Sequence, residues 1–188
     1  SIDVSGQSNL TMLIVDNNNL NGINVSNNPL LNRLFLDNNN ITSLDLSNQT
    51  ALDQLKVTNN SLNNIDLFNC ASLTLLNLNN NSISSIDLTN NISLSYLGIE
   101  NNNLTEIDVS LITALGYFKT NNNTNLSCIQ INSNQLDDIN TNSKPNWSKD
   151  NSSSYSLNCN PQTYSMNVTA SSASDYTLSG SDRNGNVT

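Results

Sequence analysis

A period of 21 residues constrains this chain more than any other feature of its sequence. Leucines recur at this interval without exception: Leu10, Leu31, Leu52, Leu73, Leu94 and Leu115. The positions three and five residues further on are apolar in nearly every repeat. An asparagine column follows in the same register: Asn18, Asn39, Asn60, Asn81, Asn102 and Asn123. A fixed period of about 20 to 50 residues indicates a repeat array, whose units stack and share one interior.

Each repeat reads L-x-x-L-x-L-x-x-N-x-L, as in Leu31–Ile41. The L-x-L part predicts a short strand, because alternate side chains of a strand lie on one face. The pattern resembles the leucine-rich-repeat family and looks like the 21-residue repeats of secreted bacterial surface proteins. The resemblance implies a mainly β fold: a curved, right-handed solenoid with a parallel concave sheet. Strands are expected near residues 12–15, 33–36, 54–57, 75–78, 96–99 and 117–120.

The second half of each repeat is a shorter echo of the first. Segment 20–27 repeats the spacing of segment 10–17, and the same pairing recurs along the array. A repeat of 21 residues leaves no room for a proper helix on the convex side. We therefore expect short extended segments there.

The asparagines suit the corners of such a repeat. The column from Asn18 to Asn123 follows the strand, where the chain turns inward and brings backbone N–H and C=O groups into a dry interior. An amide side chain offers donors and an acceptor to these groups, so we predict a structural asparagine ladder. The preceding column, from Asn17 to Asn122, suits a tight turn because asparagine tolerates left-handed backbone.

The composition shifts after Ile131. We expect about six leucine-rich repeats over residues 1–131, beginning mid-repeat, then a C-terminal cap over 132–162 in which Trp147 covers the last open turn. Residues 163–188 alternate again and are expected to start a further β module or form a linker. The chain therefore looks like a piece of a longer protein.

Two cysteines, Cys128 and Cys159, flank the predicted cap, which resembles the capping segment of such bacterial arrays. We predict a disulfide between them, worth about 3–4 kcal/mol in the chain-entropy model. Two free thiols, the alternative, would fit a cytosolic protein. Cys70 is expected to be a free packing residue. Its column otherwise holds Asn28, Gln49, Asn91 and Ile112.

Charge and composition exclude several classes of function. Fifteen acidic against six basic residues give a net charge of −9, which argues against general nucleic-acid binding. No run of about 18 apolar residues exists, so no membrane insertion is expected. Histidine is absent, and no nucleophile or convergent carboxylate pair stands out. We therefore expect no enzyme activity, no cofactor and no metal centre.

The outward positions of the concave strands are the candidate binding site, because they differ from repeat to repeat. The three bases of the repeat region, Arg33, Lys56 and Lys119, all fall there. So do three aromatic residues, which we expect to act as stacking platforms: Phe35, Tyr96 and Tyr117. Structural roles favour the same residue in every repeat, whereas recognition favours variety, and solenoids commonly bind through the concave face. The alternative is that exposed aromatics merely reflect strand propensity.

The convex columns are more uniform, with Phe68 the exception in a column of Ser and Thr. Aspartates recur from Asp45 to Asp108. Calcium between them is a possible reading, but a linear row offers two carboxylates per gap where calcium takes about six to eight oxygens. Hydroxyls or backbone amides are expected to compensate the charge instead.

These features predict an extracellular recognition or adhesion module. Its partner would be a protein or an anionic or hydroxyl-rich polysaccharide, bound through the concave face. A structural spacer or stalk in a multidomain surface protein is the alternative. Binding to an ice surface is a third reading, but it would need the asparagine ladder to point outward.

Overall fold

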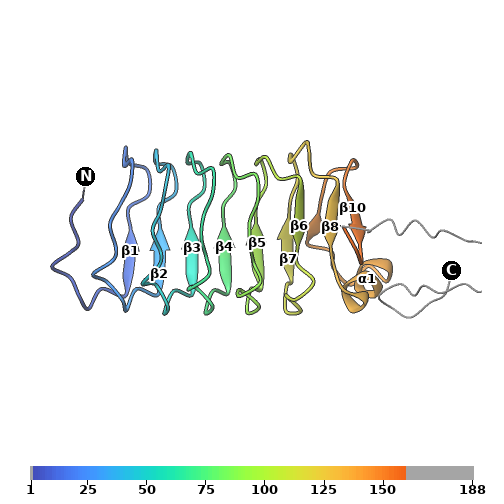
Figure 1. Cartoon of the computed structure of the whole chain (residues 1–188), viewed down its shortest axis with the longest axis horizontal. Coiled ribbons are helices and arrows are strands. Elements are labelled where there is room, and N and C mark those ends of the chain that lie inside the picture. The colour runs from blue at the N-terminus through green and yellow to red at the C-terminus, as the bar shows by residue number, and fades with distance from the viewer. Residues whose placement is uncertain (1, 160–188) are drawn as a thin grey trace, which may run out of the picture.

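The computed structural model describes residues 2–159, which form a solenoid of stacked coils (Figure 1). Seven strands run parallel along one side and form what we call the concave sheet. Its strands are β1 Met12–Ile14, β2 Arg33–Phe35, β3 Gln54–Lys56, β4 Leu75–Asn77, β5 Tyr96–Gly98, β7 Tyr117–Lys119 and β9 Trp147–Ser148. The predicted solenoid, its parallel sheet and the positions of its strands are confirmed.

Strand register follows the repeat directly. Leu13 pairs with Leu34, and Leu34 pairs with Leu55, so each coil places its leucine beside that of the next. The middle residue of every strand from β1 to β7 in the concave sheet is buried. The residues on either side of it are partly or fully exposed, apart from the buried Gly98 of β5. One continuous apolar interior therefore runs through the array and ends at Trp147.

The convex side is less regular than the sequence suggested. A second parallel sheet forms only near the C-terminal end, in the order β10-β8-β6. These strands are β6 Glu106–Asp108, β8 Cys128–Gln130 and β10 Ser154–Ser156. Backbone bonds join the coils there, as from Val109 N–H to the Gln130 carbonyl. In earlier coils the equivalent segments lie outside regular strands.

The C-terminal segment caps the array by adding one strand to each sheet. Strand β9 extends the concave sheet from β7, and β10 extends the convex sheet from β8. The ring of Trp147 meets Phe118 edge-on at 5.1 Å, and its indole N–H donates to the Leu115 carbonyl at 3.1 Å. Trp147 thus covers the last coil, as predicted.

A helix and a disulfide complete the cap. Helix α1, Ser133–Asn140, begins with a capping box between Asn132 and Gln135. The predicted disulfide between Cys128 and Cys159 is confirmed, with an S–S distance of 2.04 Å. The module or linker predicted for 163–188 lies outside the described residues. Within residues 2–159, no helix has the length and apolar character needed to cross a membrane.

Candidate binding face

The concave sheet sorts the predicted binding residues into two clusters. The first lies on β2 and β3, where Phe35 and Lys56 are paired in register. The ammonium group of Lys56 stands 4.7 Å from the centroid of the Phe35 ring. Arg33 lies on the same strand as Phe35 and is exposed. The quadrupole of an aromatic ring attracts a cation that lies over its face, so this contact favours a position of the Lys56 ammonium next to the Phe35 ring.

The second cluster lies on β5 and β7. Tyr96 and Tyr117 are paired in register and their rings stack at 4.1 Å with an interplanar angle of 6°. The ammonium group of Lys119 stands 5.1 Å from the Tyr117 centroid. Burial, followed by the neighbouring Tyr117 hydroxyl, raises the pKa of Tyr96 above its ordinary value. The Tyr96 phenol therefore stays neutral at physiological pH.

This geometry changes what the aromatic residues can offer a ligand. Tyr96 and Tyr117 cover one face of each other, and Lys56 and Lys119 cover Phe35 and Tyr117. The surface facing a partner therefore consists of ring edges, phenol hydroxyls and cations more than of open ring faces. The rings of Phe35 and Tyr117 contact the ammonium groups of Lys56 and Lys119. The prediction that the rings act as stacking platforms for a ligand did not anticipate this arrangement.

None of the concave cations forms an ion pair among residues 2–159, although Lys56 is near enough to oppose slightly the rise in the pKa of Asp37 that burial causes. Within residues 2–159 the one ion pair joins Lys144 to Asp138, at 3.5 Å, in the cap. Arg33, Lys56 and Lys119 each stand without a carboxylate inside 4.0 Å in this part of the chain. A partner carboxylate could thus approach them without displacing an existing ion pair.

A polar row borders the clusters where the strands end. The carboxylate of Asp16 accepts the backbone N–H of Asp37 at 2.8 Å, and that of Asp37 accepts the backbone N–H of Thr58 at 2.6 Å. Burial raises the pKa of Asp37, and the hydrogen bond from Thr58 opposes that shift. These side chains satisfy backbone donors of the next coil, a role that the sequence analysis did not identify.

The asparagine column behind this row bonds to backbone instead of to other asparagines. The Asn60 side chain accepts the Ile41 N–H at 2.8 Å and donates to the Leu36 and Thr58 carbonyls at 2.9 and 3.1 Å. We call this column the concave-corner ladder. The same acceptor bond recurs at Asn39, Asn81, Asn102 and Asn123. Asn18 is exposed, against expectation, because its coil has no earlier described coil of this kind beside it.

The preceding asparagines form the turn itself. Each has a positive φ, between 53° and 62°, in the left-handed region predicted for this corner. They are Asn17, Asn38, Asn59, Asn80, Asn101 and Asn122. Asparagine reaches this conformation at lower cost than most side chains, which explains why no other residue type replaces it.

Comparison with solved structures places this architecture among known proteins. The functional domain of InlJ from Listeria monocytogenes, described as including a cysteine ladder, matches with 34% identity and a TM-score of 0.64. The match covers 70% of this chain and 32% of that one. The repeat signature of this chain and its stacked coils with a parallel sheet are those of leucine-rich repeats. This chain is a leucine-rich-repeat protein.

Two more distant structures share the fold of this leucine-rich-repeat chain. The protein LIC12759 from Leptospira interrogans is 21% identical, with a TM-score of 0.59 over 68% of this chain and 38% of that one. An internalin, inlF, from Listeria monocytogenes is 23% identical, with a TM-score of 0.51 over 82% and 46%. The chain thus spans less than half the length of each structure. No family model and no curated protein matches it.

A second inward column, which we call the convex-corner ladder, was not predicted. Its members are Asn28, Gln49, Cys70 and Asn91. All four are buried, and Gln49 and Asn91 donate to carbonyls of the preceding coil, as in the bond from Gln49 to Val25 at 2.8 Å. Three amide oxygens, of Asn28, Gln49 and Asn91, are buried and accept no hydrogen bond in the described part of the chain.

Cys70 stands where the other members of this ladder carry an amide. It is free, and its sulfur lies 4.0 Å from the Leu46 carbonyl, consistent with the predicted packing role. Burial, with a smaller effect from Asp66, raises the pKa of the Cys70 thiol to about 11. The thiol is therefore protonated and unreactive at neutral pH.

The convex aspartates compensate their charge with backbone amides, as expected. Asp45, Asp66 and Asp87 each accept the N–H two residues on, at 3.0, 2.9 and 2.9 Å. These bonds lower the pKa of Asp45 and Asp87. Across residues 2–159, no cluster of three or more His, Cys, Asp or Glu side chains has the arrangement to hold a metal ion.

Proposed function

We propose that this leucine-rich-repeat array is a non-enzymatic recognition module whose concave sheet binds an acidic surface of a partner protein. The observation that carries the proposal is the set of cations on that sheet that form no ion pair within residues 2–159. Arg33, Lys56 and Lys119 lie on one face of a chain whose net charge is −9. Concentrating the few positive charges on one face orients an acidic partner toward it during encounter.

The aromatic residues support the same interface. Ring edges and hydroxyls of Tyr96 and Tyr117 supply contact area at low conformational cost, as tyrosines do at protein interfaces. The ring beneath Lys56 and the ring beside Lys119 reduce the water around each ammonium. A cation already partly stripped of water loses less on meeting a carboxylate, so such pairs contribute more than fully exposed ones.

The proposed setting is outside the cell, on a secreted or surface-anchored protein. A disulfide joining the cap to the last coil supports this setting, because disulfides persist in oxidising compartments. An anionic polysaccharide is the competing ligand. The mutual stacking of Tyr96 and Tyr117 makes that reading weaker, because sugars pack on open ring faces.

The test uses two polyanions and two variants. Immobilised poly-glutamate represents an acidic protein surface, and polygalacturonate represents an acidic polysaccharide. Replacing Arg33, Lys56 and Lys119 by Ala should weaken binding to poly-glutamate at least tenfold and leave the unfolding temperature unchanged. The control variant, Asn24→Asp, Asn63→Asp and Asn64→Asp, makes the same change of charge at exposed positions outside the concave sheet.

Three outcomes would count against the proposal. Equal losses in both variants would mean that net charge alone governs binding. A clear preference for polygalacturonate would replace the protein partner by a polysaccharide. No binding to either polymer would favour the spacer interpretation.

A further inference from the structure

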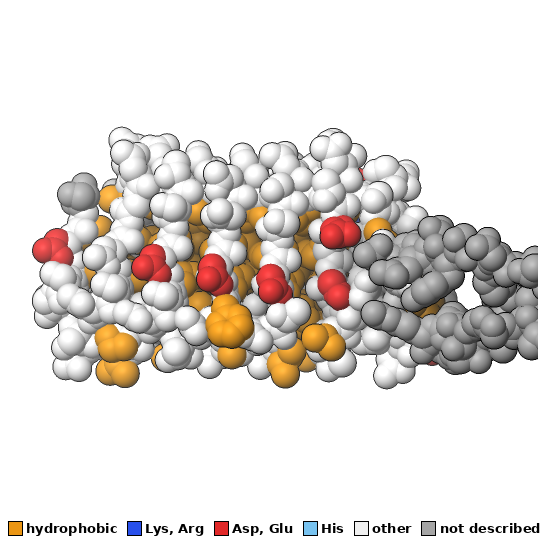
Figure 2. Space-filling model, viewed as in Figure 1, with side chains coloured by type: hydrophobic (Ala, Val, Ile, Leu, Met, Phe, Trp, Pro, Cys, Tyr) orange, Lys and Arg blue, Asp and Glu red, His pale blue; other side chains and the backbone are white. Residues whose placement is uncertain are grey.

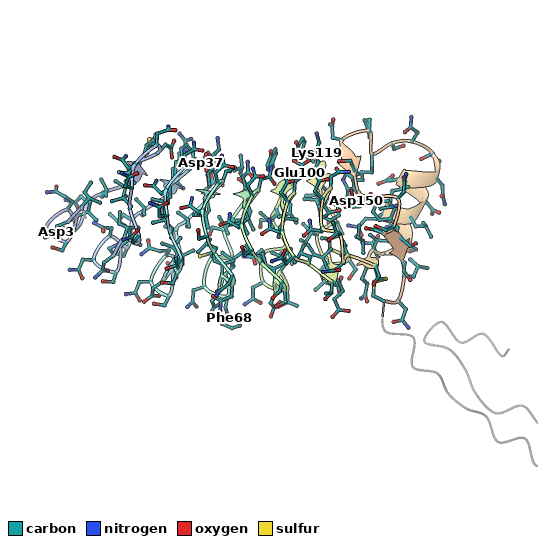
Figure 3. All side chains as sticks on the ribbon, turned by 90° about the horizontal axis from the view of Figure 1, so that it is seen from above. Asp3, Asp37, Phe68, Glu100, Lys119 and Asp150 are labelled. Atoms are coloured by element: carbon teal, nitrogen blue, oxygen red, sulfur yellow. A yellow bond between two sulfur atoms is a disulfide. The ribbon has the colours of Figure 1, made fainter. Side chains whose placement is uncertain are left out.

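Four large apolar side chains stand exposed on the convex side of the solenoid. Leu30, Phe68, Ile92 and Leu111 have relative exposures of 51%, 66%, 55% and 58%. Figure 2 shows apolar side chains gathered along one edge of this face, below a row of acidic side chains. Figure 3 places Phe68 on the side opposite Asp37, Glu100 and Lys119. This surface is therefore separate from the concave sheet, and we call it the convex apolar row.

Each of these residues departs from the pattern of its own column. The other coils carry Ser or Thr where one has Phe68, and Asn or Gly where one has Leu111. The column of Ile92 otherwise holds Ser8, Pro29, Thr50, Ala71 and Thr113. The equivalents of Leu30 are Asn9, Ala51, Ser72, Ser93 and Ala114. The fold tolerates small or polar residues at all four positions, so stability does not explain the apolar ones.

The acidic row beside them is fixed in place. The carboxylates of Asp66 and Asp87 are anchored by the backbone N–H groups of Phe68 and Thr89. Between them lies a shallow hollow, whose lining includes Asp66, Phe68, Asp87 and Asn90. The view of this face in Figure 2 shows no basic side chain. The described bases lie on the concave sheet or in the cap: Arg33, Lys56, Lys119, Lys144 and Lys149.

We propose that the convex apolar row, with the aspartates beside it, docks a basic amphipathic segment of a second protein. Apolar side chains of that segment would cover Phe68, Ile92 and Leu111, and its Lys or Arg side chains would meet Asp66 and Asp87. Contiguous exposed apolar groups beside polar ones mark interaction surfaces on proteins. The proposal does not depend on the concave site, which selects the opposite charge.

Charge complementarity selects this occupant over two others. A second copy presenting the same face would set aspartates against aspartates, which opposes self-association. An anionic membrane surface would be repelled for the same reason. A cationic segment with an apolar side satisfies both rows at once.

The experiment measures binding of a short amphipathic Leu/Lys peptide to the intact chain. The variant Phe68→Ser, Ile92→Thr and Leu111→Asn installs at each position a residue that other coils carry there. It should lower affinity about tenfold or more and leave the unfolding temperature nearly unchanged. The variant Asp66→Asn and Asp87→Asn keeps the anchoring side-chain oxygens and should weaken binding while reducing its dependence on salt.

Matched controls separate docking from non-specific adhesion. A Leu/Glu peptide of the same length should bind more weakly, and Ala at Arg33, Lys56 and Lys119 should not weaken binding of the Leu/Lys peptide. The proposal is overturned if the apolar variant binds the Leu/Lys peptide as the parent chain does. Equal affinity for the two peptides would also overturn it, as would a monomer–dimer equilibrium abolished by the apolar variant.

Discussion

The concave-corner and convex-corner ladders both hydrogen-bond backbone groups where the chain turns between the two sides of a coil, but they do so in different ways. At the concave corner, the amide oxygens from Asn39 to Asn123 each accept a backbone N–H of the neighbouring coil. At the convex corner, the oxygens of Asn28 and Gln49 are buried and accept none among residues 2–159. The side chains there need only donate. The concave corner, where the side chain both accepts and donates, holds only asparagine. The convex corner, where the amides only donate, is less strict, since the same column also holds Cys70, a weak donor, and Ile112, which cannot donate.

Removing a concave-corner amide should have the largest effect. Asn60→Ala leaves the Ile41 N–H without its side-chain acceptor and removes one of the two amide donors to the Leu36 carbonyl, which keeps Asn39. We expect a loss of about 1–3 kcal/mol in the free energy of unfolding, measured by urea denaturation. Ser61→Ala, at the exposed next position, is the control. Equal denaturation midpoints for the two variants would contradict the ladder.

Removing a convex-corner amide should cost less. Asn91→Ala removes two donor bonds, to the Leu67 and Cys70 carbonyls, but also removes an amide oxygen that is buried without a partner. Compared with Asn102→Ala, we expect roughly half the loss, about 1 kcal/mol. A larger loss for Asn91→Ala than for Asn102→Ala would mean that the two corners do not differ in this way.

Restoring an amide at Cys70 should be mildly stabilising. Asn28 and Asn91 each donate to two carbonyls of the preceding coil, and Asn at position 70 would have the Leu46 and Gln49 carbonyls in the equivalent places. We expect a gain of up to about 1 kcal/mol for Cys70→Asn in thermal or urea unfolding. Cys70→Ala, which adds no donor, should give no gain. A destabilised Cys70→Asn variant would show that the interior cannot take the extra volume.

The last prediction involves no change in the free energy of unfolding, because it tests the accessibility of the Cys70 thiol. The pKa of Cys70 is about 11, and the side chain is buried, so the folded protein should react slowly with a thiol reagent at pH 8. Unfolding without reduction should expose one reactive thiol. Three thiols would show that Cys128 and Cys159 are not joined.

The sequence predicted the features that depend on exact repetition. Strand positions, the left-handed corner at Asn17 and its equivalents, and the disulfide all follow from periodicity or flanking position. The stack of Tyr96 on Tyr117 was not predicted, although the strand register that brings the two rings together follows from the same period. These features required no knowledge of how far each side chain is exposed.

Features without a shared residue type were missed. The sequence analysis placed Asn28, Gln49 and Cys70 in one column, but their mixed residue types did not reveal the buried hydrogen bonds of the convex-corner ladder. The convex apolar row could be identified only from the exposure of its side chains. The sequence alone did not distinguish Ile92 and Leu111 from buried apolar residues. Hydrogen bonding between convex segments depends on the distance between coils, which the repeat does not specify.

One measurement addresses the proposed concave interface directly, and the molecule contains its own controls. Lysine reactivity toward an acetylating reagent is quantified by mass spectrometry with and without oligo-glutamate. Lys56 and Lys119, on the concave sheet, should become protected about threefold or more, whereas Lys144 and Lys149, in the cap, should react unchanged. Protection of the cap lysines alone, or no protection at Lys56 and Lys119 under saturating ligand, would contradict recognition through the concave sheet.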